Sequence, residues 1–109
     1  MDLITIDEFL KIKLVVGKVI DVQDHPNADR LYILKVDLGN EVRQIVSGIK
    51  QWYKKEELLN KKIIIVYNLQ PKSFRGVESQ GMLLAAEDGN GNLSLLTVDR
   101  DIKEGSFVH

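Results

Sequence analysis

The sequence predicts an all-β domain built on a five-stranded Greek-key barrel, with a short helix between the third and fourth strands and extensions at both ends. Runs of β-branched residues recur at short intervals and are separated by glycine, proline, asparagine and aspartate. Long helical segments do not alternate with these runs, which argues against a parallel sheet. A chain of 109 residues suffices for one domain with its own core, so we expect a single domain over residues 1–109.

The N-terminal extension carries a helix signal. Thr5 and Glu8 have the spacing of a capping box, which predicts a short helix that starts after Thr5 and ends near Lys11. So short a helix is not stable alone, and we expect it to dock on another surface. The first strand is predicted over residues 14–22. Gly17 interrupts this strand and predicts a bulge or bend that lets one strand serve two sheets.

Turn residues and apolar runs then alternate along the middle of the chain. Residues 25–29 form a predicted turn that contains proline, asparagine and aspartate. The second and third strands are predicted over residues 31–38 and 42–46, with a hairpin turn at residues 39–40. Residues 53–60 predict a short helix before the fourth strand.

The remaining strands complete the predicted barrel. The fourth strand is expected over residues 63–67 and the fifth over residues 82–86, followed by a late hairpin with its turn at residues 88–92 and its return strand at residues 93–98. This order favours a barrel of the oligonucleotide/oligosaccharide-binding (OB) type. Apolar residues in the two extensions need a partner surface, either the same barrel or a second subunit; they include Phe9, Leu95, Leu96 and Phe107.

The residue types give little support for catalysis or a metal site. The chain has no cysteine, which excludes disulfides, thiolate metal sites and cysteine nucleophiles. His25 precedes a proline in a turn and has no second histidine or cysteine nearby, so we assign it a structural role. Ser47 lacks the pattern of a nucleophile elbow, and residues 89–91 lack that of a phosphate loop. We predict no catalytic residue, no metal and no cofactor.

Cellular location is predicted from absent signals. No apolar run approaches the length of a membrane span, and the N-terminus has no signal-peptide pattern. Together with the lack of cysteine, this leads us to expect a cytoplasmic protein with no membrane partner.

The distribution of charge is more informative than its sum. The net charge of −1 argues against binding of nucleic acid through bulk charge alone. Residues 41–81 nevertheless carry eight of the fifteen basic side chains and only four of the sixteen acidic ones. Local fields steer a polyanion. Chance clustering of lysines on a solvated face is the alternative, and charge alone leaves both interpretations open.

Residues 68–82 form a predicted loop between the fourth and fifth strands. Pro71 cannot donate to a sheet ladder, so regular strand should end before it. Gly76 and Gly81 allow the positive φ that sharp turns need. A loop held between two buried strands can present several side chains that suit phosphate and sugar oxygens: Lys72, Arg75, Ser79 and Gln80.

Three blocks together resemble the tRNA-binding domain family. The first is Val-Gly-Lys-Val at residues 16–19 with His-Pro-Asn-Ala-Asp-Arg-Leu-Tyr at residues 25–32, the second is Gln-Ile-Val-Ser-Gly-Ile at residues 44–49, and the third is the loop at residues 68–82. This family includes freestanding tRNA-binding proteins and the C-terminal domain of many methionyl-tRNA synthetases. The resemblance covers nearly the whole chain, and the blocks occur in the family's order.

The resemblance implies structure-specific binding of tRNA, mostly at the outer corner of the molecule, by a homodimer that reads few bases. In a synthetase such a module would raise the affinity for tRNA. Carried over by position, the implied contacts are Asn68, Lys72, Arg75, Ser79, Gln80 and Met82, with Arg30, Lys35 and Arg43 as additions from the strand face. Met82 has a second interpretation, as a residue that enters the core.

This sequence departs from the family pattern within the loop. Family members often carry cations at the positions of Gln70 and Ser73 and a methionine at that of Phe74. Each missing phosphate contact should lower both the affinity and its salt dependence. We hypothesise that Phe74 compensates by stacking on an exposed base. Trp52 and Tyr53 could stack on bases or pack against the barrel, and both readings stay open.

Two other functions fit the same sequence. One is a dimeric export chaperone of the same fold that binds unfolded polypeptide, a branch to which the resemblance extends. The other is a protein–protein scaffold that acts through its tail. The sequence also leaves open whether the chain is a freestanding protein or the excised C-terminal domain of a methionyl-tRNA synthetase.

Overall fold

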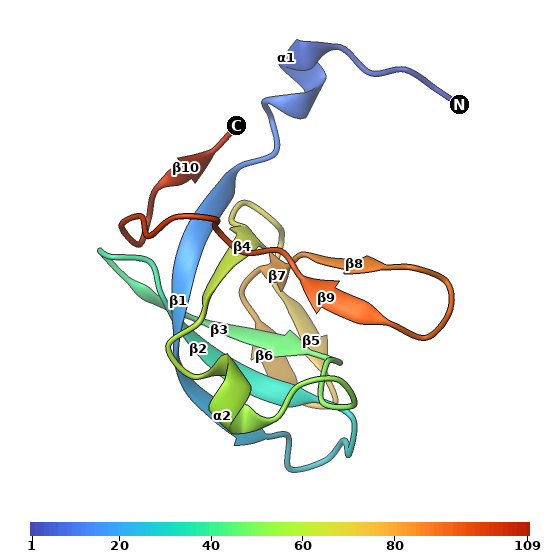
Figure 1. Cartoon of the computed structure of the whole chain (residues 1–109), viewed down its shortest axis with the longest axis vertical. Coiled ribbons are helices and arrows are strands. Elements are labelled where there is room, and N and C mark those ends of the chain that lie inside the picture. The colour runs from blue at the N-terminus through green and yellow to red at the C-terminus, as the bar shows by residue number, and fades with distance from the viewer.

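The computed structural model describes residues 1–109 and shows an antiparallel, nearly closed barrel (Figure 1). Its main sheet has the strand order β3-β2-β1-β4-β7, and β10 pairs with β1 off this path. The strands are β1 (Leu14–Asp24), β2 (Tyr32–Asp37), β3 (Val42–Ser47), β4 (Lys62–Val66), β7 (Met82–Leu83) and β10 (Phe107–Val108). The predicted all-β, OB-type fold is confirmed, and the first four strands lie within two residues of their predicted bounds.

Strand β1 connects the parts of the barrel, because it pairs with β2, β4 and β10. The register with β2 shifts between Val19 and Asp21, so the predicted irregularity is present but lies beyond Gly17. Gly17 has a different role. A Cβ there would come within 2.3 Å of Val36 Cγ1 and 2.8 Å of Leu38 Cδ2, so glycine allows β2 to approach β1 closely.

Aliphatic side chains from all four long strands fill the barrel and form the core. The helix α2 (Lys55–Leu58) lies at one end, between β3 and β4 (Figure 1), as the sequence predicted. It contributes Leu58, which is fully buried. The largest fully buried side chains are Leu34, Ile45, Leu58, Ile63 and Ile65.

The barrel closes between β3 and the chain just after β6 (Val77–Ser79), and side chains carry out much of the closure. The amide of Gln44 donates to Gln80 Oε1 at 2.9 Å, and the amide of Gln80 donates to the Gln44 carbonyl at 2.7 Å. The amide of Val46 donates to Ser79 Oγ at 2.9 Å. These bonds satisfy the outer edge of β3, which would otherwise be an unpaired strand edge.

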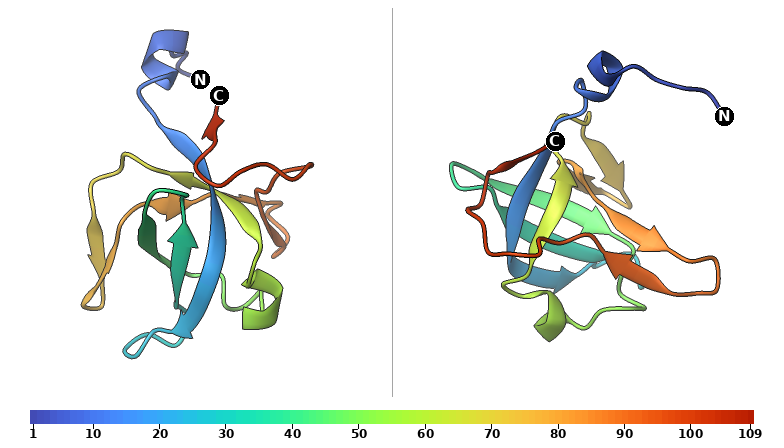
Figure 2. Two further views of the ribbon diagram at one scale, coloured as in Figure 1. Left: turned by 90° about the vertical axis from the view of Figure 1, so that its left-hand side faces the viewer. Right: turned by 45° about the horizontal axis from the view of Figure 1, so that its top comes forward.

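The N-terminal helix forms as predicted but buries none of its residues against this chain. In α1 (Ile6–Phe9), Thr5 Oγ1 accepts from the Glu8 amide and Glu8 Oε1 accepts from the Thr5 amide, both at 3.1 Å, so the capping box is complete. No residue of α1 is buried, and the helix stands away from the barrel in every view (Figures 1 and 2). Neither helix has the length or apolar character to cross a membrane.

Residues 68–82 are not wholly the loop that we predicted, because they contain a small hairpin. Strand β5 (Lys72–Phe74) pairs with β6, and two residues with positive φ join them, Arg75 at 51° and Gly76 at 87°. Strands of three residues are too short to show a clear alternating pattern. The proline and glycines therefore predicted turns, and no signal in the sequence predicted the two short strands of the hairpin.

The predicted fifth strand is broken into two at Leu84. The Leu84 amide donates to the Ile64 carbonyl, whereas the Leu84 carbonyl accepts from the Leu96 amide, so the chain changes partner at this residue. Beyond it, β8 (Ala85–Glu87) and β9 (Leu93–Leu95) form a separate two-stranded sheet that projects from the barrel (Figure 1). Leu95 is buried in the chain's own core, which answers the question of its partner surface.

Candidate nucleic-acid interface

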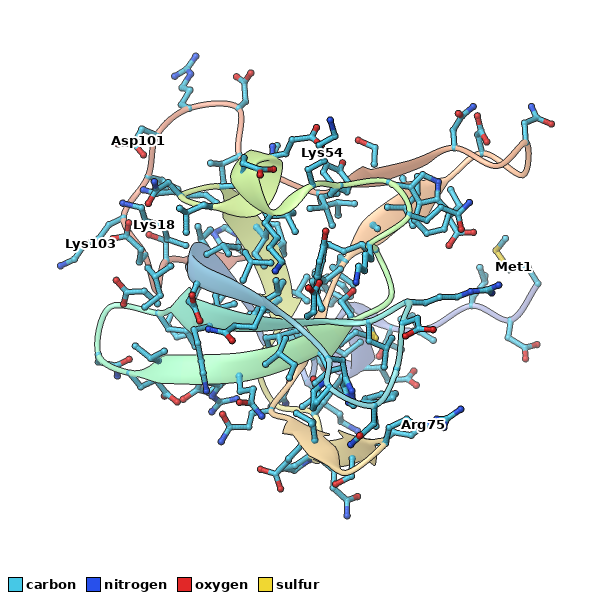
Figure 3. All side chains as sticks on the ribbon, turned by 90° about the horizontal axis from the view of Figure 1, so that it is seen from below. Met1, Lys18, Lys54, Arg75, Asp101 and Lys103 are labelled. Atoms are coloured by element: carbon cyan, nitrogen blue, oxygen red, sulfur yellow. The ribbon has the colours of Figure 1, made fainter.

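The β5–β6 hairpin presents two cations to solvent. Lys72 begins β5 and Arg75 forms the turn; both are exposed, and the Arg75 side chain points away from the barrel (Figure 3). Lys72 Nζ lies 5.3 Å from the centroid of the Phe74 ring, within range of a cation–π contact. Phe74 is half-buried. Neither cation pairs with a carboxylate, so both charges remain available to a phosphate.

Four other cations among residues 41–81 pair with carboxylates: Arg43, Lys50, Lys55 and Lys62. Asp24 accepts from both Lys50 and Lys55, and hydrogen bonds from Lys50 and then Lys55 hold the pKa of Asp24 below its usual value. Lys62 pairs with Asp101, which raises the pKa of Lys62. The unpaired charge is therefore concentrated more strongly at the hairpin than composition suggests.

His25 fixes the hairpin to the turn between β1 and β2. Its side chain is buried, with 5% exposed. Nδ1 accepts from the Asn27 amide at 3.0 Å, so Nε2 carries the hydrogen and donates to the Phe74 carbonyl at 2.7 Å. Asn27 Nδ2 donates to the Arg75 carbonyl. The predicted structural role of His25 is confirmed, and no three His, Cys, Asp or Glu side chains form a cluster that could hold a metal.

Ser79 and Gln80 lie at the base of the hairpin, where they hold it to β3. Ser79 is only 3% exposed, and its hydroxyl accepts from the Val46 amide and donates to the Gly81 carbonyl at 2.9 Å. This hydroxyl has no free hydrogen for RNA, so the geometry gives Ser79 a positioning role in place of the contact that we expected. Gln80 is half-buried and uses Oε1 on β3, which leaves its Nε2 free.

Two further expected contacts lie beside the hairpin and interact with the N-terminal segment. Asn68 Oδ1 accepts from the Lys13 amide at 2.8 Å, and Asn68 Nδ2 donates to the Lys11 carbonyl at 2.7 Å. Both ends of this amide are therefore used to hold the chain before β1. Met82 is 48% exposed and lines an apolar groove with Phe9, so it does not enter the core.

Arg43 belongs to a cluster that the sequence did not reveal. Its Nε donates to Glu41 Oε1 at 2.8 Å, and its guanidinium lies 3.8 Å from the centroid of the Tyr67 ring. Nη1 donates to the carbonyls of Tyr67 and Gln80. The Tyr67 hydroxyl donates to Glu41 Oε2 at 2.7 Å. Hydrogen bonds from Arg43 and then Tyr67 lower the pKa of Glu41, and the bond to Glu41 raises the pKa of Tyr67.

The other two expected cations, Lys35 and Arg30, differ in whether their side chains already make a hydrogen bond. Lys35 is half-buried, and its Nζ donates to Gln44 Oε1 at 2.7 Å. Arg30 is exposed in the turn before β2 and makes no hydrogen bond or ion pair. Tyr53 packs against the core, whereas Trp52 is half-buried and its Nε1 donates to the Gly91 carbonyl.

A family model described as a putative tRNA binding domain matches residues 14–107. The chain belongs to this tRNA-binding domain family. The family resemblance inferred from the three sequence blocks is thereby confirmed.

Similar proteins include full-length synthetases. The chain is 60% identical over 108 residues to the methionine–tRNA ligase of Pyrococcus horikoshii and 56% identical over 108 residues to that of Thermococcus onnurineus. These matches cover 99% of this chain but only 15% of each ligase. The chain therefore corresponds to a small part of those proteins.

Similar solved structures match from end to end. A MetRS-related protein from Pyrococcus horikoshii is 44% identical with a TM-score of 0.94, and the match covers 100% of both chains. A CsaA chaperone from Picrophilus torridus is 35% identical with a TM-score of 0.89, covering 98% of this chain and 100% of the other. The chain is thus similar both to a MetRS-related protein and to a chaperone.

Proposed function

We propose that residues 1–109 form one non-catalytic module that binds folded tRNA through the β5–β6 hairpin. One observation carries this proposal. Lys72 and Arg75 are exposed cations without a carboxylate partner, and they lie on a hairpin that is fixed at both its tip and its base. Because the hairpin backbone is already fixed, only the cationic side chains lose conformational freedom on binding, so more of their attraction for phosphate contributes to affinity. Membership of the tRNA-binding domain family supplies the class of ligand.

The proposed contact residues fall into groups that differ in their exposure and in whether the protein already holds their side chains. Lys72, Arg75 and Arg30 are exposed cations without partners and would neutralise phosphates. Phe74 keeps part of its ring accessible for stacking on a base. The half-buried residues Lys35, Arg43 and Gln80 would donate to RNA from fixed positions. Asn68, Ser79 and Met82 act, in this proposal, by shaping the surface.

The protein context follows from the coverage of the relatives. We infer that the chain acts either as the appended C-terminal part of a methionyl-tRNA synthetase or as a freestanding protein that resembles the MetRS-related protein of equal length. In a synthetase the module would raise the effective concentration of tRNA at the enzyme without contributing to the chemistry.

We also propose a symmetric homodimer, because an apolar face remains uncovered. A groove of about 470 Å³ lies between the N-terminal segment and the barrel, and its apolar lining includes Phe9, Ile12, Leu69, Met82 and Leu84. Phe107 is 73% exposed nearby on β10, and no residue of α1 is buried. Apolar surfaces of this kind mark interaction sites, and a two-fold dimer would cover them in both copies.

A salt titration tests the RNA contact. The affinity for tRNA, measured by fluorescence anisotropy at several salt concentrations, should fall in the variant with Lys72→Ala and Arg75→Ala. The slope of log K against log salt should become shallower by roughly 1.5 for two lost phosphate contacts. Lys103→Ala is the control, since Lys103 is exposed and lies on the far side of the molecule from Arg75 (Figure 3).

Unchanged affinity and slope in the double variant would refute the hairpin as the contact surface, and a wild-type chain that binds no tRNA at low salt would refute the function itself. Sedimentation of the same samples reports the number of subunits. A monomer at micromolar concentration would contradict the proposed dimer.

The likeness to a CsaA chaperone supports one alternative, binding of unfolded polypeptide in the apolar groove. Competition separates the two functions. If a reduced, unfolded polypeptide displaces tRNA poorly, RNA is the preferred ligand. Tighter binding of the polypeptide than of tRNA would favour the chaperone.

A further inference from the structure

A polar hollow lies at the base of the β5–β6 hairpin, and two of the RNA contacts proposed above, Arg43 and Gln80, are part of its lining. Its volume is about 650 Å³, and its lining includes Arg43 on β3, Tyr67 at the end of β4, the segment Leu69–Pro71, and Gln80. Lys72 pairs with Ser79 across the hairpin, so Pro71 and Gln80 face each other at its base. The hollow therefore directly adjoins the proposed phosphate-binding cations.

We propose that this hollow holds one unstacked nucleobase of the bound RNA. The inference rests on the tRNA-binding function proposed above and adds a specific feature to it. A volume of this size lies in the range of sites for small ligands. Sequence-dependent recognition of RNA commonly uses bases turned out of the stack and placed on aromatic rings or guanidinium planes.

The charge balance of the hollow favours a neutral ligand over phosphate. Glu41 contacts Arg43 at 2.8 Å and neutralises the only cation in the lining. The exposed cations of the hairpin have no such partner. A polyanion crossing this surface would therefore place its phosphates at Lys72 and Arg75, and an uncharged planar group would suit the hollow.

Arg43 offers a stacking surface that is already fixed. Tyr67 covers one face of its guanidinium at 3.8 Å, and 20% of the Arg43 side chain remains exposed. Glu41 Oε1 and the carbonyls of Tyr67 and Gln80 fix the orientation of the plane. A base that enters the hollow would meet the uncovered part of a plane that needs no rearrangement.

Free side-chain amides can read the edge of that base. Gln80 Nε2 has no partner in the structure and is not buried without one, so this donor is accessible. Gln70 is exposed, and its amide makes no hydrogen bond. Because Gln80 Oε1 is used on β3, its amide offers a donor in a fixed position, which favours a base with a carbonyl acceptor, such as guanine or uracil, over adenine.

Titration with mononucleotides tests the hollow independently of tRNA. In NMR spectra of the wild-type chain, addition of GMP should shift the side-chain N–H signals of Arg43 and Gln80. AMP should produce the same shifts only at a higher concentration. Ribose 5-phosphate carries the same phosphate and sugar without a base, and it should shift only signals of the hairpin. Equal responses to GMP and ribose 5-phosphate, or shifts at these signals with an unfolded peptide but not with GMP, would overturn the proposal.

A variant tests the hollow in the tRNA complex. Gln70→Ala should weaken binding of tRNA by about fivefold, the loss of one hydrogen bond to a base edge, without a change in the salt slope. Ser73→Ala, an exposed residue on the same hairpin, should change neither quantity. Suppose that wild-type protein binds tRNA. If Gln70→Ala then binds tRNA equally well, or if its slope of log K against log salt becomes shallower, the nucleobase site is refuted while the tRNA-binding function stands. Failure of wild-type protein to bind tRNA refutes the function instead.

Discussion

Replacing Ser79 by alanine should destabilise the barrel at the point where β3 meets the hairpin. The hydroxyl accepts from the Val46 amide and donates to the Gly81 carbonyl, both at 2.9 Å, and Ser79 is 3% exposed. Alanine fits the space but leaves a buried amide without an acceptor. Since an unsatisfied buried donor costs about 1–3 kcal/mol, we expect Ser79→Ala to lower the free energy of unfolding by about 2 kcal/mol.

Urea denaturation of the tRNA-free protein measures this change, and hydrogen exchange at the Val46 amide localises it. Exchange there should accelerate in Ser79→Ala by more than exchange at the buried residues of strands β2 and β4. Ser73→Ala, on the same hairpin but exposed, should stay within about 0.5 kcal/mol of wild type. The two variants differ only in whether the lost hydroxyl was used inside the protein.

The same variant distinguishes a positioning role from a direct contact. If Ser79 acts by fixing the hairpin, stability and affinity for tRNA fall together, and additives that restore stability restore affinity. If Ser79→Ala keeps wild-type stability within about 0.5 kcal/mol and still weakens binding of tRNA, the hydroxyl reaches the RNA and our reasoning about its burial is wrong.

Three further changes test other parts of the structure. Gly17→Ala should lower the free energy of unfolding by about 1–3 kcal/mol in a urea titration, because its Cβ would lie 2.3 Å from Val36 Cγ1; full stability would show that β1 and β2 are less closely packed. Glu78→Gln removes an exposed carboxylate from the hairpin and should raise the affinity for tRNA severalfold at low salt only, whereas an equal gain at high salt would contradict an electrostatic cause. The hydrogen bond from Lys62 lowers the pKa of Asp101. The stabilisation from this pair is therefore present above the unfolded pKa of Asp101, about 4, and is lost as the pH falls through the folded pKa. Lys62→Met should reduce the dependence of the urea midpoint on pH below about 4, and an unchanged profile would assign that dependence to other carboxylates.

Local patterns in the sequence predicted the features that local interactions determine. The capping box at Thr5 and Glu8 is present because both bonds join residues three positions apart. The first four strands follow from runs of β-branched residues, and the structural role of His25 follows from its place in a proline turn. These signals lie within one short segment each.

The misjudged features depend on contacts between distant segments. Ser79 reaches Val46 across 33 positions, and Gln80 reaches Gln44 across 36, so no local pattern could show that Ser79 is buried or that one end of the Gln80 amide is used on β3. The hollow around Arg43 likewise requires Tyr67, which is 24 positions away. Resemblance to a family named several of these residues, but it could not separate those that hold the surface from those that face solvent.

Closure of the barrel and presentation of the cations depend on the same bonds. A full strand paired along β3 would satisfy its edge but would draw the hairpin into the sheet. Here Ser79 Oγ and Gln80 Oε1 satisfy that edge, and the backbone before them is free to turn outward as β5 and β6. His25 then fixes the far end of the hairpin through the Phe74 carbonyl. The hairpin backbone that carries Lys72 and Arg75 is thus held in place because side chains close the barrel. A substitution that breaks the contact between β3 and the hairpin should therefore impair RNA binding without altering any charge.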